Sequence, residues 1–373
     1  MPREFPRLAN AIEQGAARHL HTGVQVYVSV DGEVVLNAGF GEAGPGRPLD
    51  EAAIMLWRSA GKPVTAAAIL SLVEQAALRL DSTVRDCLPQ AGGDVGSITI
   101  AELLTHTSGL PLLDTGWPAL SWEDTLQRIL TAGPRDRAVA AYQPQSTWFL
   151  LGEILRRHTD PADTSASANP IDAALRRRLF SVVGMDEVWC GLPDHLVSSP
   201  RLPCYYERQR GQLTDSDYGT AAWLTAPSPG GNLRGPVRVL GEFYEMLMRG
   251  GVAADGTRVL QQSTVNDMVR RHRVDRYDET LQHVIDFGLG IIVNSNHHGV
   301  DTVPYGFSRY SSPDSFGHGG AQCSIGFCDP QRQLVVAWAA NAFCGEGQHQ
   351  RRNRAINEAI YEDLGFVASA TSA

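Results

Sequence analysis

The chain starts and finishes with segments in which hydrophobic and polar residues alternate as they do in strands. Valine occupies every second position from 24 to 30, and apolar residues resume after an Asp-Gly pair. This pattern predicts a β-hairpin over residues 24–40. Residues 323–341 predict a second hairpin around an Asp-Pro turn, and residues 287–293 have strand character.

The middle of the chain has the pattern of helices. Residues 63–80 have no glycine, a proline only at their first position and apolar residues almost throughout, which predicts a largely buried helix. Strands at both ends with helices between them are typical of an α/β domain that carries an insertion. We therefore expect an α/β domain of residues 1–80 and 226–373, and an inserted, mostly helical domain of residues 81–225. Residues 351–366 predict a closing helix.

Length and charge narrow the class of protein. A chain of 373 residues is long for one core and favours two subdomains. Its net charge of −9 argues against nucleic acid or an anionic membrane as partner. No apolar run reaches the ~18 residues of a membrane span. The first twenty residues show no signal-peptide pattern, so we expect a cytoplasmic protein. Nothing in the pattern indicates an oligomeric state.

The cysteines and histidines do not predict a metal site. None of the cysteines are spaced as C-x-x-C, and we expect mostly buried free thiols at positions 87, 190, 204, 323, 328 and 344. His19 with His21 and His297 with His298 are the remaining candidates. No acidic or cysteine partner stands at ligand spacing from either pair in the sequence, so we expect no metal.

Lys62 is the only lysine among the 32 lysines and arginines of the chain. Arginine stays protonated at any ordinary pH, whereas lysine loses its proton when its pKa is lowered. Ser59 stands three residues earlier, at the start of the predicted buried helix, so both side chains lie on one face. The helix N-terminus favours negative charge on the serine oxygen, and burial disfavours a protonated lysine. The pair predicts a nucleophile and its base; the alternative is a capping serine beside an exposed lysine.

Three stretches carry a family resemblance. They are WRSAGKPVTAAAIL at 57–70, LLTHTSGLP at 103–111 and FGHGGAQ at 316–322. In this order the chain resembles the serine hydrolases of the β-lactamase and penicillin-binding-protein superfamily, and more closely the class C β-lactamase-like branch, which includes family VIII esterases. The resemblance covers nearly the whole chain. It implies a β-lactamase-like α/β fold: an antiparallel sheet flanked by helices, with an inserted, mostly helical domain.

The resemblance also implies catalytic roles. Ser59 is the implied nucleophile and Lys62 its general base. Tyr142 matches the tyrosine of the family's Y-x-N motif, which implies a second acid and base. Pro144 stands where that motif has asparagine, as the family's esterase-like and acyltransferase-like members also lack it. The asparagine orients an amide substrate, so its absence counts against penicillin chemistry.

His318, Gly319 and Gly320 match the family's K-T-G element. The implied reason for the glycines is that substrate lies beside this strand. A histidine in place of the lysine is expected to bind a carboxylate only weakly at neutral pH. The N–H of Ala321 is expected to form an oxyanion hole with the N–H of Ser59.

These implications predict a serine acyl hydrolase that acts on a small-molecule ester or amide through an acyl-enzyme, without metal or cofactor. The first alternative is a transacylase of secondary metabolism, for example in nucleoside antibiotic biosynthesis, with an amine or alcohol acceptor. Others are a β-lactamase or D,D-peptidase-like enzyme and a non-catalytic binding protein. Trp148 is a candidate for substrate binding, with core packing as the equal alternative.

Overall fold

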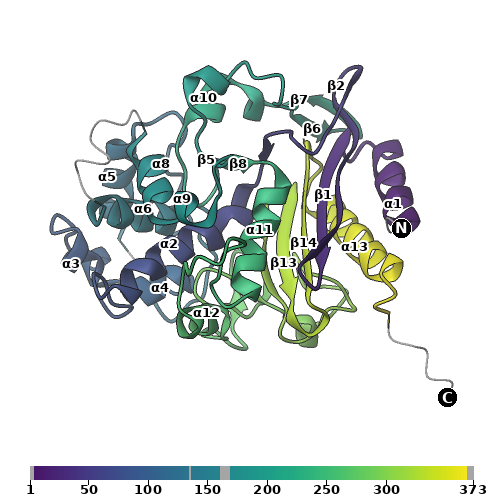
Figure 1. Ribbon diagram of the computed structural model, residues 1–373. Coiled ribbons are helices and arrows are strands. Elements are labelled where there is room, and N and C mark those ends of the chain that lie inside the picture. Colours follow the sequence, from purple (N-terminus) through teal and green to yellow (C-terminus); the bar gives the residue numbers. More distant parts are fainter. Residues whose placement is uncertain (1–3, 134–135, 160–168, 368–373) are drawn as a thin grey trace.

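A seven-stranded antiparallel sheet organises the protein, as the computed structural model in Figure 1 shows. The structure describes residues 4–133, 136–159 and 169–367. The strand order is β11-β12-β13-β14-β1-β2-β3. In that order the strands are β11 (Ile292–Val293), β12 (Phe316–Gly320), β13 (Ser324–Asp329), β14 (Leu334–Ala340), β1 (Gly23–Val30), β2 (Glu33–Gly44) and β3 (Arg47–Pro48). The two termini of the chain therefore contribute to one sheet.

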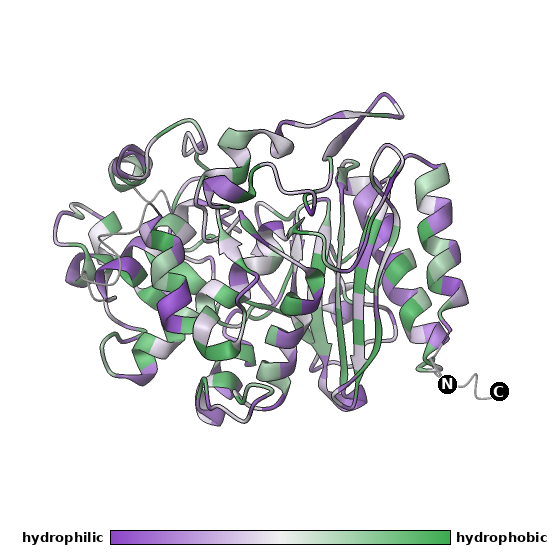
Figure 2. Ribbon diagram, turned by 45° about the horizontal axis from the view of Figure 1, so that its top comes forward, coloured by the Kyte–Doolittle hydropathy of each residue, from purple (hydrophilic) through white to green (hydrophobic). Residues whose placement is uncertain are grey.

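Helices cover both faces of this sheet. α1 (Pro6–Ala17) and α13 (Glu346–Asp363) pack together on one face, and α11 (Val237–Met248) lies against β1, β13 and β14 on the other (Figure 1). Trp338 of β14 donates its indole N–H to Asn357 of α13 at 2.8 Å, which fixes that helix on the sheet. Figure 2 shows hydrophobic residues along the central strands, whereas the outer helices also carry hydrophilic ones.

The remaining helices form a layer beyond α11. They are α2 (Lys62–Glu74), α3 (Val84–Cys87), α4 (Ile100–Leu104), α5 (Trp122–Ala132), α6 (Ser146–Arg157), α8 (Pro170–Leu175), α9 (Ser181–Val183), α10 (Ala221–Thr225) and α12 (Gln262–Val269). Short strands form two further sheets of three strands each. One consists of β4 (Met55–Leu56), β8 (Leu233–Gly235) and β5 (Trp189–Cys190). The other consists of β15 (Ala342–Phe343), β6 (Tyr206–Gln209) and β7 (Gln212–Asp215). β9 (Tyr277–Asp278) pairs with β10 (His283–Val284). No described helix is long and apolar enough to cross a membrane.

α2 is buried on all sides over its first eleven residues, from Lys62 to Leu72. Its apolar residues are distributed around the whole helix, because α6 packs on one side and the sheet side of the core on another. A charged residue within this stretch of eleven is therefore held away from water. Lys62, its first residue, is in that position.

The α/β fold with an antiparallel sheet flanked by helices is confirmed, as are both hairpins. The buried helix ends at Glu74 rather than at residue 80, and the closing helix begins at Glu346, ahead of the expected 351. The expected strand over 287–293 is wrong except for Ile292–Val293. The domain boundaries at 80/81 and 225/226 stay a prediction.

Candidate active site

Ser59 and Lys62 lie on a tight turn that leads into α2. The turn, η1 (Arg58–Gly61), is a 3-10 helix whose first residue adopts a left-handed conformation, with φ of 49°. Such a conformation is strained for a residue with a side chain and is typical of functional sites. Gly61 permits the close approach of β8, because a Cβ there would lie 2.6 Å from Cδ1 of Leu233. In this turn, Nζ of Lys62 lies 3.0 Å from Oγ of Ser59.

The surroundings of Lys62 indicate a neutral amine. Nζ donates hydrogen bonds to the carbonyl oxygens of Pro144, at 2.8 Å, and Gly230. Both forms of an amine can make two such bonds, so burial decides its charge. Burial, with the positive charge of Arg58, lowers the pKa of Lys62 well below its usual value. A neutral amine has two N–H groups, which the carbonyls use, and its lone pair then faces the Ser59 hydroxyl.

Tyr142 completes the group of three. Its hydroxyl is hydrogen-bonded to that of Ser59, and burial raises its pKa above the usual value, so it is a phenol rather than a phenolate. Its main-chain N–H donates to Oδ1 of Asp278 at 3.0 Å. Asp278 is buried and is held by Arg273 at 2.9 Å. This buried ion pair fixes the position of the tyrosine backbone.

Pro144 contributes its carbonyl oxygen to Lys62 and offers no amide side chain to a ligand. It sits just before α6, and the next residue, Gln145, lines the cavity described below. The position that holds asparagine in the Y-x-N motif thus supports Lys62 through its carbonyl oxygen and offers no side-chain amide to the cavity.

The strand β12 has an open edge beside Ser59. Its partner β11 pairs only with Phe316 and Gly317, so the edge of residues 318–320 carries no neighbouring strand. Among the described residues, no acceptor takes a hydrogen bond from the N–H of Ser59 or of Ala321. Both residues line the same cavity. Two free amides and a free strand edge therefore face it.

Protein neighbours leave no room for side chains on the glycines of this strand. A Cβ on Gly319 would lie 2.2 Å from Cδ1 of Tyr305. One on Gly320 would lie 2.1 Å from Oγ of Ser324 and 2.3 Å from the carbonyl oxygen of Trp57. Packing is therefore one reason for both glycines, and the expected room for substrate stays a prediction. Their absence of side chains lets the strand pack against the turn that carries Ser59.

His318 is a neutral hydrogen-bond acceptor. Its Nδ1 lies 2.7 Å from the carbonyl oxygen of Gly319 and must donate to it, which leaves Nε2 without a proton. Nε2 is buried, and no described protein group bonds to it. Burial lowers the pKa of His318 to about 3. From the sequence we expected His318 to bind a carboxylate only weakly. A ring that is neutral near pH 7 supplies no positive charge to attract a carboxylate.

These groups open onto a cavity of about 620 Å³. Its walls include Trp117, Ile292 and Tyr305, and Glu346 accepts a hydrogen bond from the Tyr305 hydroxyl at 2.7 Å. Trp148 does not line it. That ring is fully buried, 5.1 Å from Lys62 Nζ, so its assignment to substrate binding is corrected to core packing.

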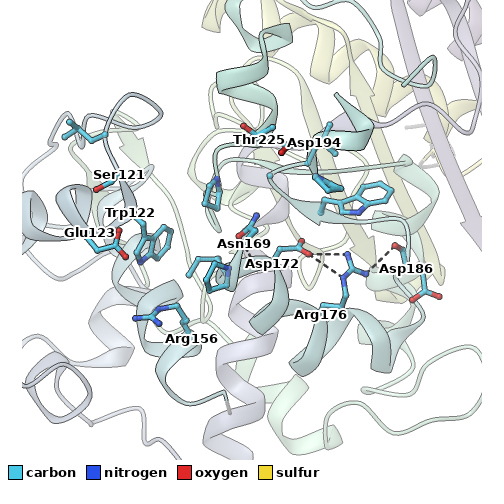
Figure 3. A pocket seen from close by; sticks show the side chains of 18 residues that line it. Ser121, Trp122, Glu123, Arg156, Asn169, Asp172, Arg176, Asp186, Asp194 and Thr225 are labelled. Atoms are coloured by element: carbon cyan, nitrogen blue, oxygen red, sulfur yellow. Dashed lines mark hydrogen bonds and ion pairs between the residues drawn. The ribbon is translucent and has the colours of Figure 1, made fainter. Parts of the chain in front are cut away.

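A larger cavity, of about 920 Å³, lies away from this group, beside α5, α6 and α8 (Figure 3). Its polar side chains are engaged with one another: Arg176 contacts Asp172 at 3.5 Å and also bonds the backbone of Asp186. Ser121, its hydroxyl-bearing candidate, donates to Asp124 and caps α5. No base faces a nucleophile among the described lining residues, so the smaller cavity is the candidate active site.

The cysteines take no part in either cavity. All six are free thiols; Cys204 is exposed, Cys87 is half-buried and the other four are buried. Burial raises the pKa of the Cys190 and Cys328 thiols well above their usual value. The expectation of mostly buried thiols is confirmed.

Comparison with known proteins identifies the family. The sequence model of the Beta-lactamase family matches residues 8–361, nearly the whole chain. The chain belongs to the Beta-lactamase family. Within this family it is 27% identical over 282 residues to penicillin-binding protein 4 of Amycolatopsis lactamdurans, which is 71% of this chain and 69% of that protein.

Solved structures agree on the Beta-lactamase fold. A family VIII carboxylesterase superposes with a TM-score of 0.74 at 22% identity, over 96% of this chain and 97% of the other. EstCE1, described as a hydrolase with promiscuous acyltransferase activity, gives a TM-score of 0.76 at 18% identity, over 94% and 98%. The resemblance seen in the three sequence stretches is thereby confirmed at the level of family and fold.

Proposed function

We propose that the protein is a serine hydrolase that turns over a small-molecule ester through an acyl-enzyme on Ser59. The observation that carries the proposal is the distance of 3.0 Å between Nζ of the fully buried Lys62 and Oγ of Ser59. Burial lowers the pKa of Lys62 well below its usual value, which favours the neutral amine. A buried amine in this position is a general base already in its active form. Ser59 itself lines a cavity of the size that small ligands occupy.

The mechanism follows from the three side chains. Lys62 takes the proton of Ser59 as Oγ attacks the ester carbonyl, and the amides of Ser59 and Ala321 stabilise the oxyanion. Each such amide contributes about 3 kcal/mol. Tyr142, a phenol at neutral pH, gives its proton to the leaving alcohol and recovers one from Lys62. Water then enters, the same groups act in reverse, and the acid is released.

Two positions favour an ester over a β-lactam or a D-Ala-D-Ala peptide. Pro144 supplies no side-chain amide to hold a substrate amide, and neutral His318 supplies no charge for a substrate carboxylate. The likeness to the family VIII carboxylesterase supports this choice, while the likeness to penicillin-binding protein 4 keeps the peptidase and β-lactamase alternatives open to test.

A transacylase is the second candidate. The cavity of about 620 Å³ has room for an acyl group and an acceptor together, and the likeness to EstCE1 supports it. Hydrolysis and transfer share every step up to the acyl-enzyme. They are distinguished by product partitioning at a fixed donor ester, with and without a panel of amine and alcohol acceptors. A product ratio that no acceptor changes would exclude transfer to that panel.

The experiment for the nucleophile is covalent labelling. The protein is treated with a fluorophosphonate and digested, and the labelled peptide is identified by mass spectrometry. We expect label on Ser59, and none in Ser59→Ala. Ser121→Ala, which removes the exposed helix-capping serine of α5, is the matched control and should label fully. Label on another serine would sink the assignment, and a protein without any label would support the binding-protein alternative.

A further inference from the structure

Four side chains from three segments converge away from the cavity. His297 and His298 end the short turn η6 (Asn296–His298), Asp286 precedes β11, and Asp275 lies in the segment between α12 and β9. One ligand atom from each lies within 4.8 Å of all the others. Asp275 and Asp286 stand 11 or more positions away from the histidines along the chain, so the sequence did not show them as partners. The fold supplies both.

Three of the four distances between histidine nitrogens and aspartate oxygens are close to those between ligands of one metal ion, and the fourth is longer. Nε2 of His298 lies 3.4 Å from Oδ1 of Asp286 and 3.4 Å from Oδ1 of Asp275. Nε2 of His297 lies 3.5 Å from Oδ2 of Asp286 and 4.0 Å from Oδ1 of Asp275. Good hydrogen bonds between such atoms are about 2.7–3.2 Å long. Ligands about 2.1 Å from a tetrahedral zinc ion are about 3.4 Å from one another.

The charges also suit a dication. Asp286 is fully buried and its Oδ2 is 3.0 Å from Nε of Arg271, which orients the carboxylate and offsets part of its charge. The N–H of Asp275 donates to Oδ1 of Asp286 at 3.2 Å, so the two acidic residues are held side by side. Two carboxylates against one guanidinium leave a net negative charge between two imidazole rings. This placement of like charges is stabilised by a cation between them.

We propose that Asp275, Asp286, His297 and His298 bind one zinc ion. Imidazole nitrogen and carboxylate oxygen are both zinc ligands and four of them complete a tetrahedral shell, while the harder magnesium and calcium ions prefer oxygen ligands alone. With four protein ligands the site is closed, and its role is structural.

Such an ion joins segments that support the active site. Asp286 is followed by Phe287, whose ring lies 6.3 Å from that of His318. Asp275 follows Arg273, the buried partner of Asp278, which holds the backbone of Tyr142. A zinc ion at this site therefore holds together the segments that support Tyr142 and His318. The site takes no part in acyl transfer and stands whether or not the proposed function holds.

The test is zinc binding by the tag-free protein. The protein is stripped with a chelator, and titration calorimetry with zinc chloride and elemental analysis then give affinity and stoichiometry. We expect one equivalent per chain and a rise in melting temperature on loading. The variant Asp275→Asn/His297→Asn changes two exposed side chains, 73% and 52% accessible, and should fold. Loss of these ligands should weaken binding by more than about 100-fold.

Two controls make the result specific. Asp194→Asn/His195→Asn changes an adjacent, exposed acid and histidine elsewhere and should bind zinc as the parent does. Ser59→Ala should also bind one equivalent, which separates this site from the catalytic proposal. Cobalt in place of zinc gives a visible absorption band that reports four-coordinate geometry. Absence of tight zinc binding by the parent, or equal affinity in the Asp275→Asn/His297→Asn variant, overturns the proposal.

Discussion

Nζ of Lys62 lies 3.0 Å from Oγ of Ser59, and no other lysine occurs in the chain. Every other position with a basic Lys or Arg side chain uses arginine, which cannot give up its proton. The structure adds a reason for a lysine at this position: burial lowers the pKa of Lys62 well below its usual value and so favours a neutral amine. Arginine does not take a neutral form at ordinary pH.

Lys62→Arg should be nearly as damaging as Lys62→Met. Arginine keeps the charge but has no deprotonated form at working pH, whereas methionine keeps the shape and loses the base. We expect kcat/KM for p-nitrophenyl acetate to fall by at least about 100-fold in both. Far-UV circular dichroism and melting temperature check that each variant is folded. If folded Lys62→Arg keeps most of its activity, the lysine acts as a charge rather than as a base.

The pH dependence of kcat/KM should follow Lys62 and not His318. Lys62 acts when deprotonated, so activity should rise with pH through its lowered pKa and then level off. The pKa of His318, lowered to about 3, places its ionisation below the measured range. His318→Asn should therefore leave the midpoint of the profile between about pH 5 and 9 in place, even where the rate falls. A midpoint that moves in His318→Asn would show that this histidine titrates.

Buried neutral histidines should make the fold sensitive to acid. The pKa of His21 is lowered to about 3 by burial and by Arg352, below its usual 6.5, so the unfolded chain binds more protons between these values. Stability is complete above pH 6.5 and is lost as pH falls toward 3. At pH 5 the loss is up to about 2 kcal/mol for this residue.

Urea unfolding at pH 7.5 and 5.0 measures this effect. His21→Gln keeps a donor for the carbonyl oxygen of Ile12, which Nε2 of His21 contacts at 3.0 Å, but cannot be protonated. It should lose less stability than the parent on acidification. His195→Gln, at an exposed histidine, should behave as the parent. Equal acid sensitivity in His21→Gln and the parent would contradict the assignment.

Substrate preference should follow Pro144 and His318. Short-chain activated esters should be hydrolysed readily, and β-lactams should be poor substrates or slow acylating inhibitors, because a penicillin offers an amide and a carboxylate that neither residue binds. Initial rates with p-nitrophenyl acetate and nitrocefin on one protein preparation decide the matter. Nitrocefin turnover comparable with ester turnover would overturn the substrate class.

Gly319→Ala should damage the site through Tyr305. The added methyl group would lie 2.2 Å from that ring, which must move, and Tyr305 lines the cavity and bonds Glu346. We expect an increase in KM larger than the loss in kcat. Gly92→Ala, which meets no atom within 4 Å and lies outside the cavity, is the matched control. Unchanged kinetics in Gly319→Ala would show that the cavity adapts at no cost.

The hairpins and the serine–lysine pair were predictable because each depends on residues that are close together in the sequence. Alternation encodes a strand face, and a spacing of three encodes one side of a helix. The segment 287–293 failed because its glycines serve other purposes: a Cβ at Gly288 would lie 2.2 Å from the carbonyl oxygen of Met268, and Gly290 has a φ of 72°. The helix from Lys62 ends early because Ala76, at a φ of 54°, turns the chain.

Features that depend on distant residues were beyond the sequence pattern. The sequence did not distinguish the roles of Trp148 and Trp117. Tertiary packing places Trp148 next to Lys62 and Trp117 on the cavity wall. The acidic partners of His297 likewise come from other segments of the chain. Local patterns predict elements and motifs, whereas the composition of a cavity or an ion site depends on tertiary contacts.

The burial of the single lysine has a practical consequence for chemical modification. Its amine is fully covered, so the described surface displays guanidinium groups and no lysine ammonium. Amine-reactive dyes, cross-linkers and coupling resins therefore find no side chain to attack on the folded protein, apart from the terminal amine. Acylation of Lys62 becomes a direct report of unfolding, and a lysine introduced at a chosen surface position becomes a unique side-chain attachment point for a probe or a support.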